Sequence, residues 1–327
     1  MKKMIALGFA LLATANMAFA APGNADGKKY LLKVGTVLAE TDPLYKGLEL
    51  FRDNVMKRTN GNVEVQVFAS SQLGKDEDVI EQARLGTNVG ITTEPGRLSA
   101  YYKDFGIFSA PYLITETSEI DKVLSTPTFK EMGKKLEPQG LHLLSFNWFQ
   151  GERHLFTKIP AAKPADLTGV RIRSMGNPVA NATMTALGGK PVTSPWAEAY
   201  QSLENKVYDA VEVHYSAALG ASIAEVTKYI EKTGHFFLMT GLVISQKWFE
   251  TLPAEYQKIV EEEAYNGGKL ATDTNIAKAD EFEKQLVSKG LTVNKIDKQA
   301  FIDACQAVYK ELGFADLKAK IDKEMGR

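Results

Sequence analysis

The spacing of apolar residues predicts alternating strands and helices in the first third of the chain. Apolar or period-two runs at 30–35, 63–67 and 88–93 are typical of strands. Between them, apolar residues recur at helical spacing from Pro43 onward and over 76–85, and a proline is tolerated in the first turn of a helix. This β-α-β-α-β order predicts a mostly parallel sheet with helices on its faces.

A second run of the same kind occupies the middle of the chain, and a long helical pattern follows it. We predict strands at 141–149, 170–173, 190–192 and 208–213, and helices over 180–187, from Ser194 as N-cap to about Asn205, over 223–232 and over 253–289. We therefore expect an α/β fold of two lobes with a ligand cleft between them, because clefts form at domain interfaces and at the carboxyl ends of parallel strands.

The first 20 residues have the pattern of a secretory signal peptide. Lys2 and Lys3 precede a short apolar stretch over 4–17, and the small-x-small sequence at 18–20 is typical of a cleavage site. We therefore predict that residues 1–20 are removed and that the protein works in a periplasm. An uncleaved anchor or a buried helix is the alternative.

Composition and charge narrow the class of protein. The chain has 327 residues, 39 Lys and Arg against 40 Asp and Glu, and 44% hydrophobic residues, which excludes a disordered chain and gives no basic excess for nucleic acid. The single cysteine, Cys305, excludes a disulfide framework and a cysteine zinc site, and its helical context predicts a core position. Because the sequence also lacks the common catalytic, phosphate-binding and zinc-protease motifs, we predict no enzyme, no cofactor and no metal site.

Arginines beside apolar strand ends are the strongest chemical signal. Arg153 follows the predicted strand at 141–149, and Arg171 and Arg173 alternate in the strand at 170–173. A guanidinium at a strand end offers a planar fork of donors that fits a carboxylate or a sulfonate. The alternative is that each arginine forms an ion pair with an acid at the surface.

Several ordered motifs resemble the solute-binding proteins of TRAP transporters, the family that includes receptors for four-carbon dicarboxylates and sialic acid. The main one runs from PADLTGVRIRSMGNP to YDAVE over 164–212. Others are ASSQLG at 69–74, ARLGT at 83–87, FGIFSAPYLI at 105–114, GERHLFT at 151–157 and WFETLPAEYQKIV at 248–260. The resemblance covers nearly all of the chain after the predicted signal peptide.

This resemblance implies a bilobed periplasmic binding protein with a hinge that closes around a small organic anion. It implies that residues 28–149 and 240–279 form lobe one, and that 150–239 and 280–327 form lobe two. The partners would be the large and small membrane permease subunits of a TRAP transporter, and the protein would act as a monomer. A secreted enzyme of the same shape and a ligand-dependent sensor subunit are the alternatives.

The resemblance also assigns roles to individual residues. Arg173 matches the arginine that clamps the anion, and Arg153 matches a second, supporting arginine. Glu94 and Arg97 match a Glu-x-x-Arg pair that faces the ligand in sialic-acid receptors, and a mutual ion pair is the alternative. Trp196 occupies the position of an aromatic residue that packs on the ligand, and a plain core residue is the alternative.

Two departures from the family pattern affect the expected ligand. Asn177 lies one step after the position where many members carry Asn, which puts that contact in doubt. Val213 replaces a hydrogen-bonding Asn, so His214 and Tyr215 become the nearest polar candidates, although a structural histidine is the alternative. With Trp148, Phe149, Trp196 and Tyr215 adding bulk near the arginines, we expect a small carboxylate or sulfonate, such as a short dicarboxylate or isethionate. The Glu94 and Arg97 match keeps sialic acid or another sugar acid open.

Overall fold

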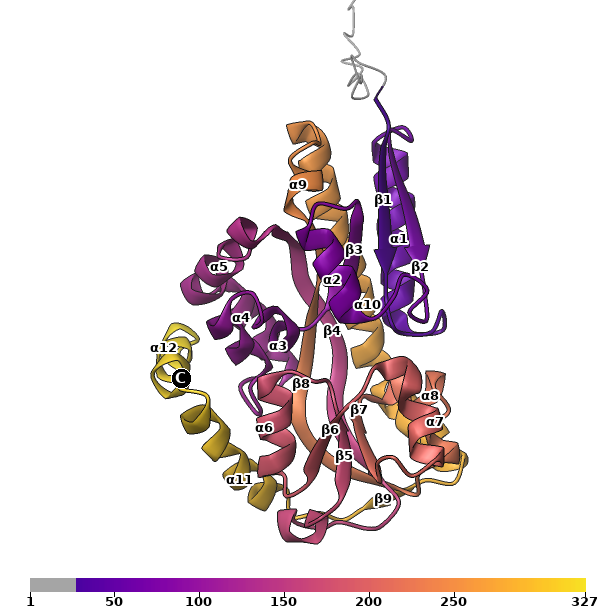
Figure 1. Ribbon diagram of the computed structural model, residues 1–327, viewed down its shortest axis with the longest axis vertical. Helices are drawn as coiled ribbons and strands as arrows, with labels where there is room; N and C mark the ends of the chain where they lie inside the picture. Colours follow the sequence, from indigo (N-terminus) through magenta and orange to yellow (C-terminus); the bar gives the residue numbers. More distant parts are fainter. Residues whose placement is uncertain (1–27) are drawn as a thin grey trace, which may run out of the picture.

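The computed structural model describes residues 28–327, so the predicted signal peptide at 1–20 lies outside the described residues. The first third of the chain forms one end of the molecule, at the top of Figure 1. We call it the β1–β3 end. Its elements are β1 (Tyr30–Gly35), α1 (Pro43–Arg58), β2 (Val63–Phe68), α2 (Asp76–Arg84), β3 (Val89–Thr93) and α3 (Pro95–Leu98), and the short helices α4 (Ile120–Ser125) and α5 (Pro127–Lys134) follow.

Two long strands connect this end to the other, which we call the β5–β7 end (Figure 1). Each of them, β4 (Leu141–Thr157) and β8 (Tyr229–Ser245), has 17 residues. The remaining elements are β5 (Arg171–Ser174), α6 (Pro178–Ala186), β6 (Lys190–Thr193), α7 (Ala199–Glu204), β7 (Ala210–Val213), α8 (Tyr215–Gly220), α9 (Gln246–Phe249), α10 (Ala254–Ser288), β9 (Thr292–Asn294), α11 (Lys298–Glu311) and α12 (Ala315–Glu324).

The strands form one mixed sheet in the order β2-β1-β3-β8-β4-β7-β5-β6, with β9 paired to β8. Pairing is parallel at both ends of the sheet and antiparallel in its centre, where β8 and β4 pair with each other and with β3 and β7. The prediction of a mostly parallel sheet therefore holds for each end but not for the centre. The carboxyl ends of β1 and β3 and those of β5 and β7 both border the space between the two ends.

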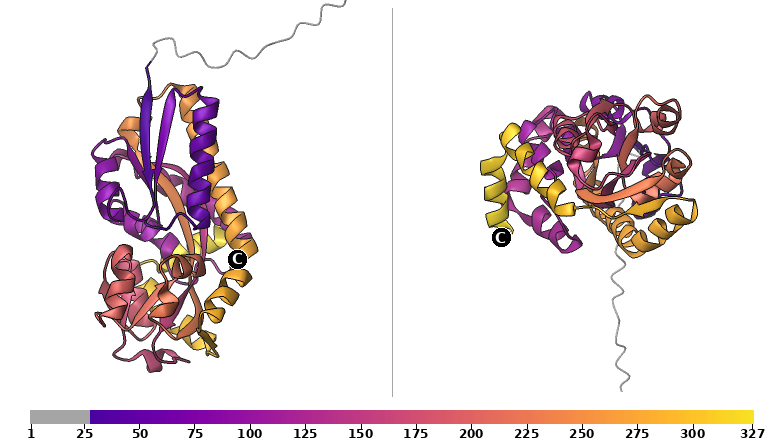
Figure 2. Two further views of the ribbon diagram at one scale, coloured as in Figure 1. Left: turned by 90° about the vertical axis from the view of Figure 1, so that its right-hand side faces the viewer. Right: turned by 90° about the horizontal axis from the view of Figure 1, so that it is seen from below.

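The long helix α10 runs beside α1 and then continues toward the β5–β7 end (Figure 2). The two helices approach closely at Gly47 and Gly267, where a Cβ on Gly267 would lie 2.6 Å from the Gly47 carbonyl oxygen. Apolar side chains of α1, β1 and α10, such as Leu48, Val34 and Val260, share one core cluster there. No helix within 28–327 is long and apolar enough to cross a membrane.

Two sequence predictions about secondary structure are wrong. The region 223–232 is not a helix: only Ile223–Glu225 makes a 3-10 turn, and β8 begins at Tyr229. Pairing with β4 and β9 overrides the local pattern there, since Ile230 pairs with Phe156 on one side and Val293 on the other. Ser194 is also not an N-cap. Pro195 caps a 3-10 turn before α7 instead.

Other predictions are confirmed. The helix predicted at 253–289 is α10, and Cys305 is fully buried in α11. From there the chain returns to the β1–β3 end, because the Tyr309 hydroxyl donates to the Pro111 carbonyl and the Thr128 hydroxyl donates to Glu324 of α12. The exact division of residues between the two lobes stays a prediction.

Candidate functional site

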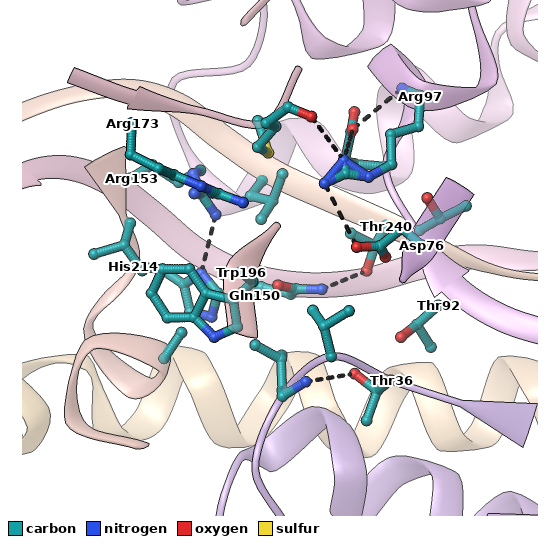
Figure 3. A pocket seen from close by; sticks show the side chains of 18 residues that line it. Thr36, Asp76, Thr92, Arg97, Gln150, Arg153, Arg173, Trp196, His214 and Thr240 are labelled. Carbon is teal, nitrogen blue, oxygen red and sulfur yellow. Dashed lines mark hydrogen bonds and ion pairs between the residues drawn. The ribbon is translucent and has the colours of Figure 1, made fainter. Parts of the chain in front are cut away.

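A cavity of about 60 Å³ lies between the two ends of the molecule, where the carboxyl ends of two parallel pairs of strands meet, β1 with β3 and β5 with β7 (Figure 3). The β1–β3 end contributes the residues that follow β1 and end β3, including Thr36 and Thr92. The β5–β7 end contributes Arg173 of β5 and His214, which follows β7. This is the kind of place where ligands bind in α/β proteins.

Arg153 and Glu212 form a buried ion pair at one wall of this cavity. Arg153 contacts Glu212 through Nε, and its Nη2 donates to Glu212 Oε1 at 2.8 Å and to the Glu212 carbonyl at 2.7 Å. Burial alone would raise the pKa of Glu212, but Arg153, His235 and Arg173 lower this pKa to about 2. Glu212 is therefore ionised, and its charge is matched to Arg153.

Arg173 lies next to this pair but has no comparable partner. Its side chain is 2% exposed, and its Nη1 lies 3.7 Å from Glu212 Oε1, beyond hydrogen-bond distance. Among the described residues, the guanidinium makes one hydrogen bond, from Nε to the Ser194 carbonyl at 3.0 Å. Burial lowers the pKa of Arg173 to about 10, with Arg97 and Arg153 adding repulsion and Glu212 opposing. Two guanidinium groups thus share one carboxylate, which leaves a surplus positive charge.

The third arginine of the cavity, Arg97, has more carboxylates around it than its single positive charge can balance. Arg97 faces Asp76 at 3.5 Å, Glu77 at 3.3 Å and Glu94 at 3.5 Å, and its Nη1 donates to the Met175 carbonyl. Figure 3 shows Arg97 and Asp76 across the cavity from Arg153 and Arg173. Burial raises the pKa of both Asp76 and Glu94. Glu94 and Arg97 thus form the mutual ion pair that is the alternative to contact with a ligand, and both residues also line the cavity.

Two other predicted residues, Trp196 and His214, line the cavity beside different arginines. The Trp196 ring packs over Arg173, with the guanidinium carbon 5.5 Å from the ring centre, and both residues line the cavity. His214 also lines it, and Arg153 Nη1 lies 3.4 Å from its Nδ1. Burial lowers the pKa of His214.

Two predicted residues do not line this cavity. Asn177 caps α6 by accepting from the Ala180 amide at 2.8 Å, and its Nδ2 donates to Glu94. The Tyr215 hydroxyl donates to Glu283 at 2.7 Å and borders a separate cavity beside α10. Among the described residues, Asn177 thus holds Glu94 in place, and Tyr215 contacts α10 rather than the arginines.

The aromatic residues expected around the arginines are mostly elsewhere. Trp148 is fully buried in the core, and Phe149 stacks on Phe237 at 4.2 Å between ring centres, beside the α10 cavity. Of the four aromatic residues, only Trp196 borders the arginine cavity. The expectation of a pocket narrowed by four aromatic rings is therefore wrong, because β4 turns Trp148 and Phe149 away from the arginines.

In place of those aromatic residues, the cavity is lined by polar residues that the sequence patterns do not single out. Thr92 and Thr93, at the end of β3, line the cavity, and neither hydroxyl has a hydrogen-bond partner among the described residues. Gln150 and Thr240 also line it and bond to each other at 3.1 Å. The two threonines are the last residues of the strand predicted at 88–93, so their place at a strand end was the available signal.

Comparison with known proteins gives the class of this chain. The family model described as bacterial extracellular solute-binding protein, family 7, matches residues 34–316. The chain is 30% identical over 251 residues to the C4-dicarboxylate-binding periplasmic protein DctP of Rhodobacter capsulatus, covering 76% of this chain and 74% of that one. It is 26% identical over 296 residues to the 2,3-diketo-L-gulonate-binding periplasmic protein YiaO of Escherichia coli, covering 89% of each.

Solved structures of TRAP periplasmic solute-binding proteins superpose on this chain. A TRAP periplasmic solute-binding protein from Escherichia fergusonii, in an open form without ligand, is 39% identical and superposes with a TM-score of 0.79, covering 90% of this chain and 99% of that one. One from Ochrobactrum anthropi with bound L-fuconate is 30% identical, with a TM-score of 0.88, and covers 91% and 100%.

The fold and the family match define a bilobed solute-binding protein of a transport system. More particularly, the chain belongs to the DctP family, the TRAP-transporter solute-binding proteins. The family is periplasmic, is not a family of enzymes, binds small organic acids and works with membrane permease subunits.

Proposed function

We propose that this protein captures an organic acid in the cavity beside Arg173 and delivers it to a TRAP permease. One observation carries the proposal: two buried guanidinium groups share the single carboxylate of Glu212. An anionic group against the free side of Arg173 would supply the missing negative charge. Charge-assisted hydrogen bonds between arginine and carboxylate or sulfonate are strong where water is excluded.

The polar lining supports a hydroxylated acid over a plain one. The unpartnered hydroxyls of Thr92 and Thr93 are costly unless a ligand or water bonds to them. The small cavity favours a short hydroxy acid, in line with the C4-dicarboxylate named for the Rhodobacter capsulatus relative. A sugar acid, such as the L-fuconate bound by the Ochrobactrum anthropi protein, is the second candidate. It would also need the adjoining cavity of about 310 Å³, which Asp42 and Trp196 line.

The overall shape supports a closed cleft. The chain superposes better on the L-fuconate-bound structure, at a TM-score of 0.88, than on the ligand-free open structure, at 0.79, although the open protein is more similar in sequence. We infer that the two ends move about a hinge and that the arrangement described here corresponds to the closed state. The arginines would then be enclosed only after the acid has entered.

A thermal-shift screen of the refolded protein tests the proposal, because refolding removes a ligand that purifies with it. The panel contains succinate, malate, 2-oxo acids, sugar acids, sialic acid, taurine and isethionate. A ligand present at a thousandfold its Kd stabilises a protein by about 4 kcal/mol, which raises Tm by several degrees. We expect such a shift for at least one acid. A folded protein that responds to no acid would contradict the proposal.

A further inference from the structure

Two buried polar atoms from opposite ends of the molecule face each other without touching. Asp42, which precedes α1, and His214, which precedes α8, bring Oδ2 and Nε2 to 3.9 Å, and both side chains are 2% exposed. Neither atom has a hydrogen-bond partner among the described residues. The gap is too long for a direct hydrogen bond, and unpaired buried polar groups are costly.

The surroundings fix which of the two atoms donates. Asp42 Oδ1 accepts from the Leu44 amide at 2.9 Å, which orients the carboxylate and leaves Oδ2 as an acceptor. Arg153 can only donate, so His214 Nδ1 accepts from it and a neutral ring carries its proton on Nε2. Burial, opposed by Asp42, lowers the pKa of His214 and keeps the ring neutral near pH 7. A donor on His214 therefore faces an acceptor on Asp42.

We propose that Asp42 and His214 form a recognition site for an alcohol hydroxyl of the bound acid. A hydroxyl can accept from His214 Nε2 and donate to Asp42 Oδ2 at the same time. A carboxylate or carbonyl oxygen only accepts and would face the Asp42 charge, whereas an ammonium group cannot accept from Nε2. This inference rests on the proposed function, because it assumes that an acid binds at Arg173.

The position of the pair relative to Arg173 fits a ligand that reaches both. His214 lines the arginine cavity, and Asp42 lines an adjoining cavity of about 310 Å³. The two cavities share lining residues, among them Trp196 and Ala217. Ser216, whose buried hydroxyl also has no partner among the described residues, lies on the adjoining side. An acid held at Arg173 can therefore extend a hydroxylated carbon chain toward Asp42.

The substitution Asp42→Asn tests the assignment with little disturbance of the fold. Asparagine caps a helix as well as aspartate does, so the bond to the Leu44 amide is kept, but Oδ2 is replaced by an N–H donor. Both flanking groups then donate, and the site favours a carbonyl oxygen over a hydroxyl. Asp209→Asn is the control, because Asp209 pairs with Arg171 at the surface, outside both cavities.

The measurement is Kd by titration calorimetry on the refolded protein, with L-malate against oxaloacetate and L-gulonate against 2,3-diketo-L-gulonate. We expect wild type to prefer the hydroxy member of at least one pair by tenfold or more. Asp42→Asn should lower that preference at least tenfold, and Asp209→Asn should keep it.

Equal weakening of both members in Asp42→Asn, or an unchanged ratio, would overturn the hydroxyl site. Binding by wild type of only non-hydroxylated acids such as succinate would also overturn it, while the proposed function would stand. Absence of binding by any acid in the wider screen would overturn both.

Discussion

Replacing Arg173 by methionine should stabilise the ligand-free protein, although it removes the proposed anion clamp. Burial lowers the pKa of Arg173 from the ordinary value of an arginine to about 10. At about 1.4 kcal/mol for each pKa unit, the charged form costs the folded state about 3 kcal/mol. Because the folded pKa lies below the unfolded one, this cost is present in full at pH 7 and is relieved only as the pH rises above about 10.

The substitution also removes favourable contacts. The hydrogen bond to the Ser194 carbonyl is worth about 1 kcal/mol, and the contact with the Trp196 ring about 0.5–1 kcal/mol. The net expectation is therefore a gain of about 1–2 kcal/mol in the free energy of unfolding. This corresponds to a rise in Tm of roughly 2–4 °C, measured by urea and thermal unfolding of refolded protein.

The neighbouring Arg153 provides the matched control, and its substitution should have the opposite sign. Arg153→Met leaves the buried Glu212 without its main partner, and breaking a buried ion pair in this way costs roughly 3–5 kcal/mol. A loss of more than 2 kcal/mol in Arg173→Met would refute the reasoning, because Arg173 would then be a structural partner of Glu212 rather than an uncompensated charge.

Three further predictions concern pH, fluorescence and helix packing. Burial lowers the pKa of His154 well below 6.5, so the unfolded state takes up a proton before the folded state does. The free energy of unfolding should therefore fall from pH 7 to pH 5, by up to about 1.4 kcal/mol per pH unit. His154→Gln should flatten this slope in urea titrations, and an unchanged slope would contradict the assignment. Trp196 should report binding, so Trp196→Phe should abolish most of the ligand-induced change in tryptophan fluorescence, whereas a change that persists would place the acid elsewhere. Gly267→Ala should destabilise by roughly 1–3 kcal/mol, because its Cβ would press on the Gly47 carbonyl, and a neutral effect in thermal unfolding would mean that α1 and α10 separate easily.

The sequence predicted the parallel ends of the sheet but not its centre. Strands such as 30–35 and helices such as 253–289 have patterns that depend on local burial alone. The start of β8 does not, because Ile230 is held extended by pairing with Phe156 and Val293, which lie far away in the sequence. Local periodicity cannot report such pairing, so the pattern of 223–232 taken alone predicts a helix.

The candidate site shows the same limit: the sequence indicates which residues could bind a ligand, but not which partners the fold brings to them. Arg173 could be singled out because it lies near the end of a strand, and Arg153 because it follows the strand predicted at 141–149, although the structure extends that strand to Thr157 and places Arg153 inside β4. The unequal pairing of the two arginines depends on Glu212, which lies on β7. The position of Trp148 in the chain predicts a place near the arginines, yet its side chain packs against α10. Thr92 shows that a strand end is informative even for a residue with no motif.

The affinity of the tightest acid of the panel for wild type and for Arg173→Met tests the central claim most directly. Titration calorimetry on refolded protein, with folding of both proteins checked by circular dichroism, gives the two Kd values. Loss of a buried charge partner worth roughly 3–5 kcal/mol predicts binding weakened by at least about 100-fold in Arg173→Met. A variant that binds the acid within tenfold of wild type would contradict the claim that Arg173 holds its acid group.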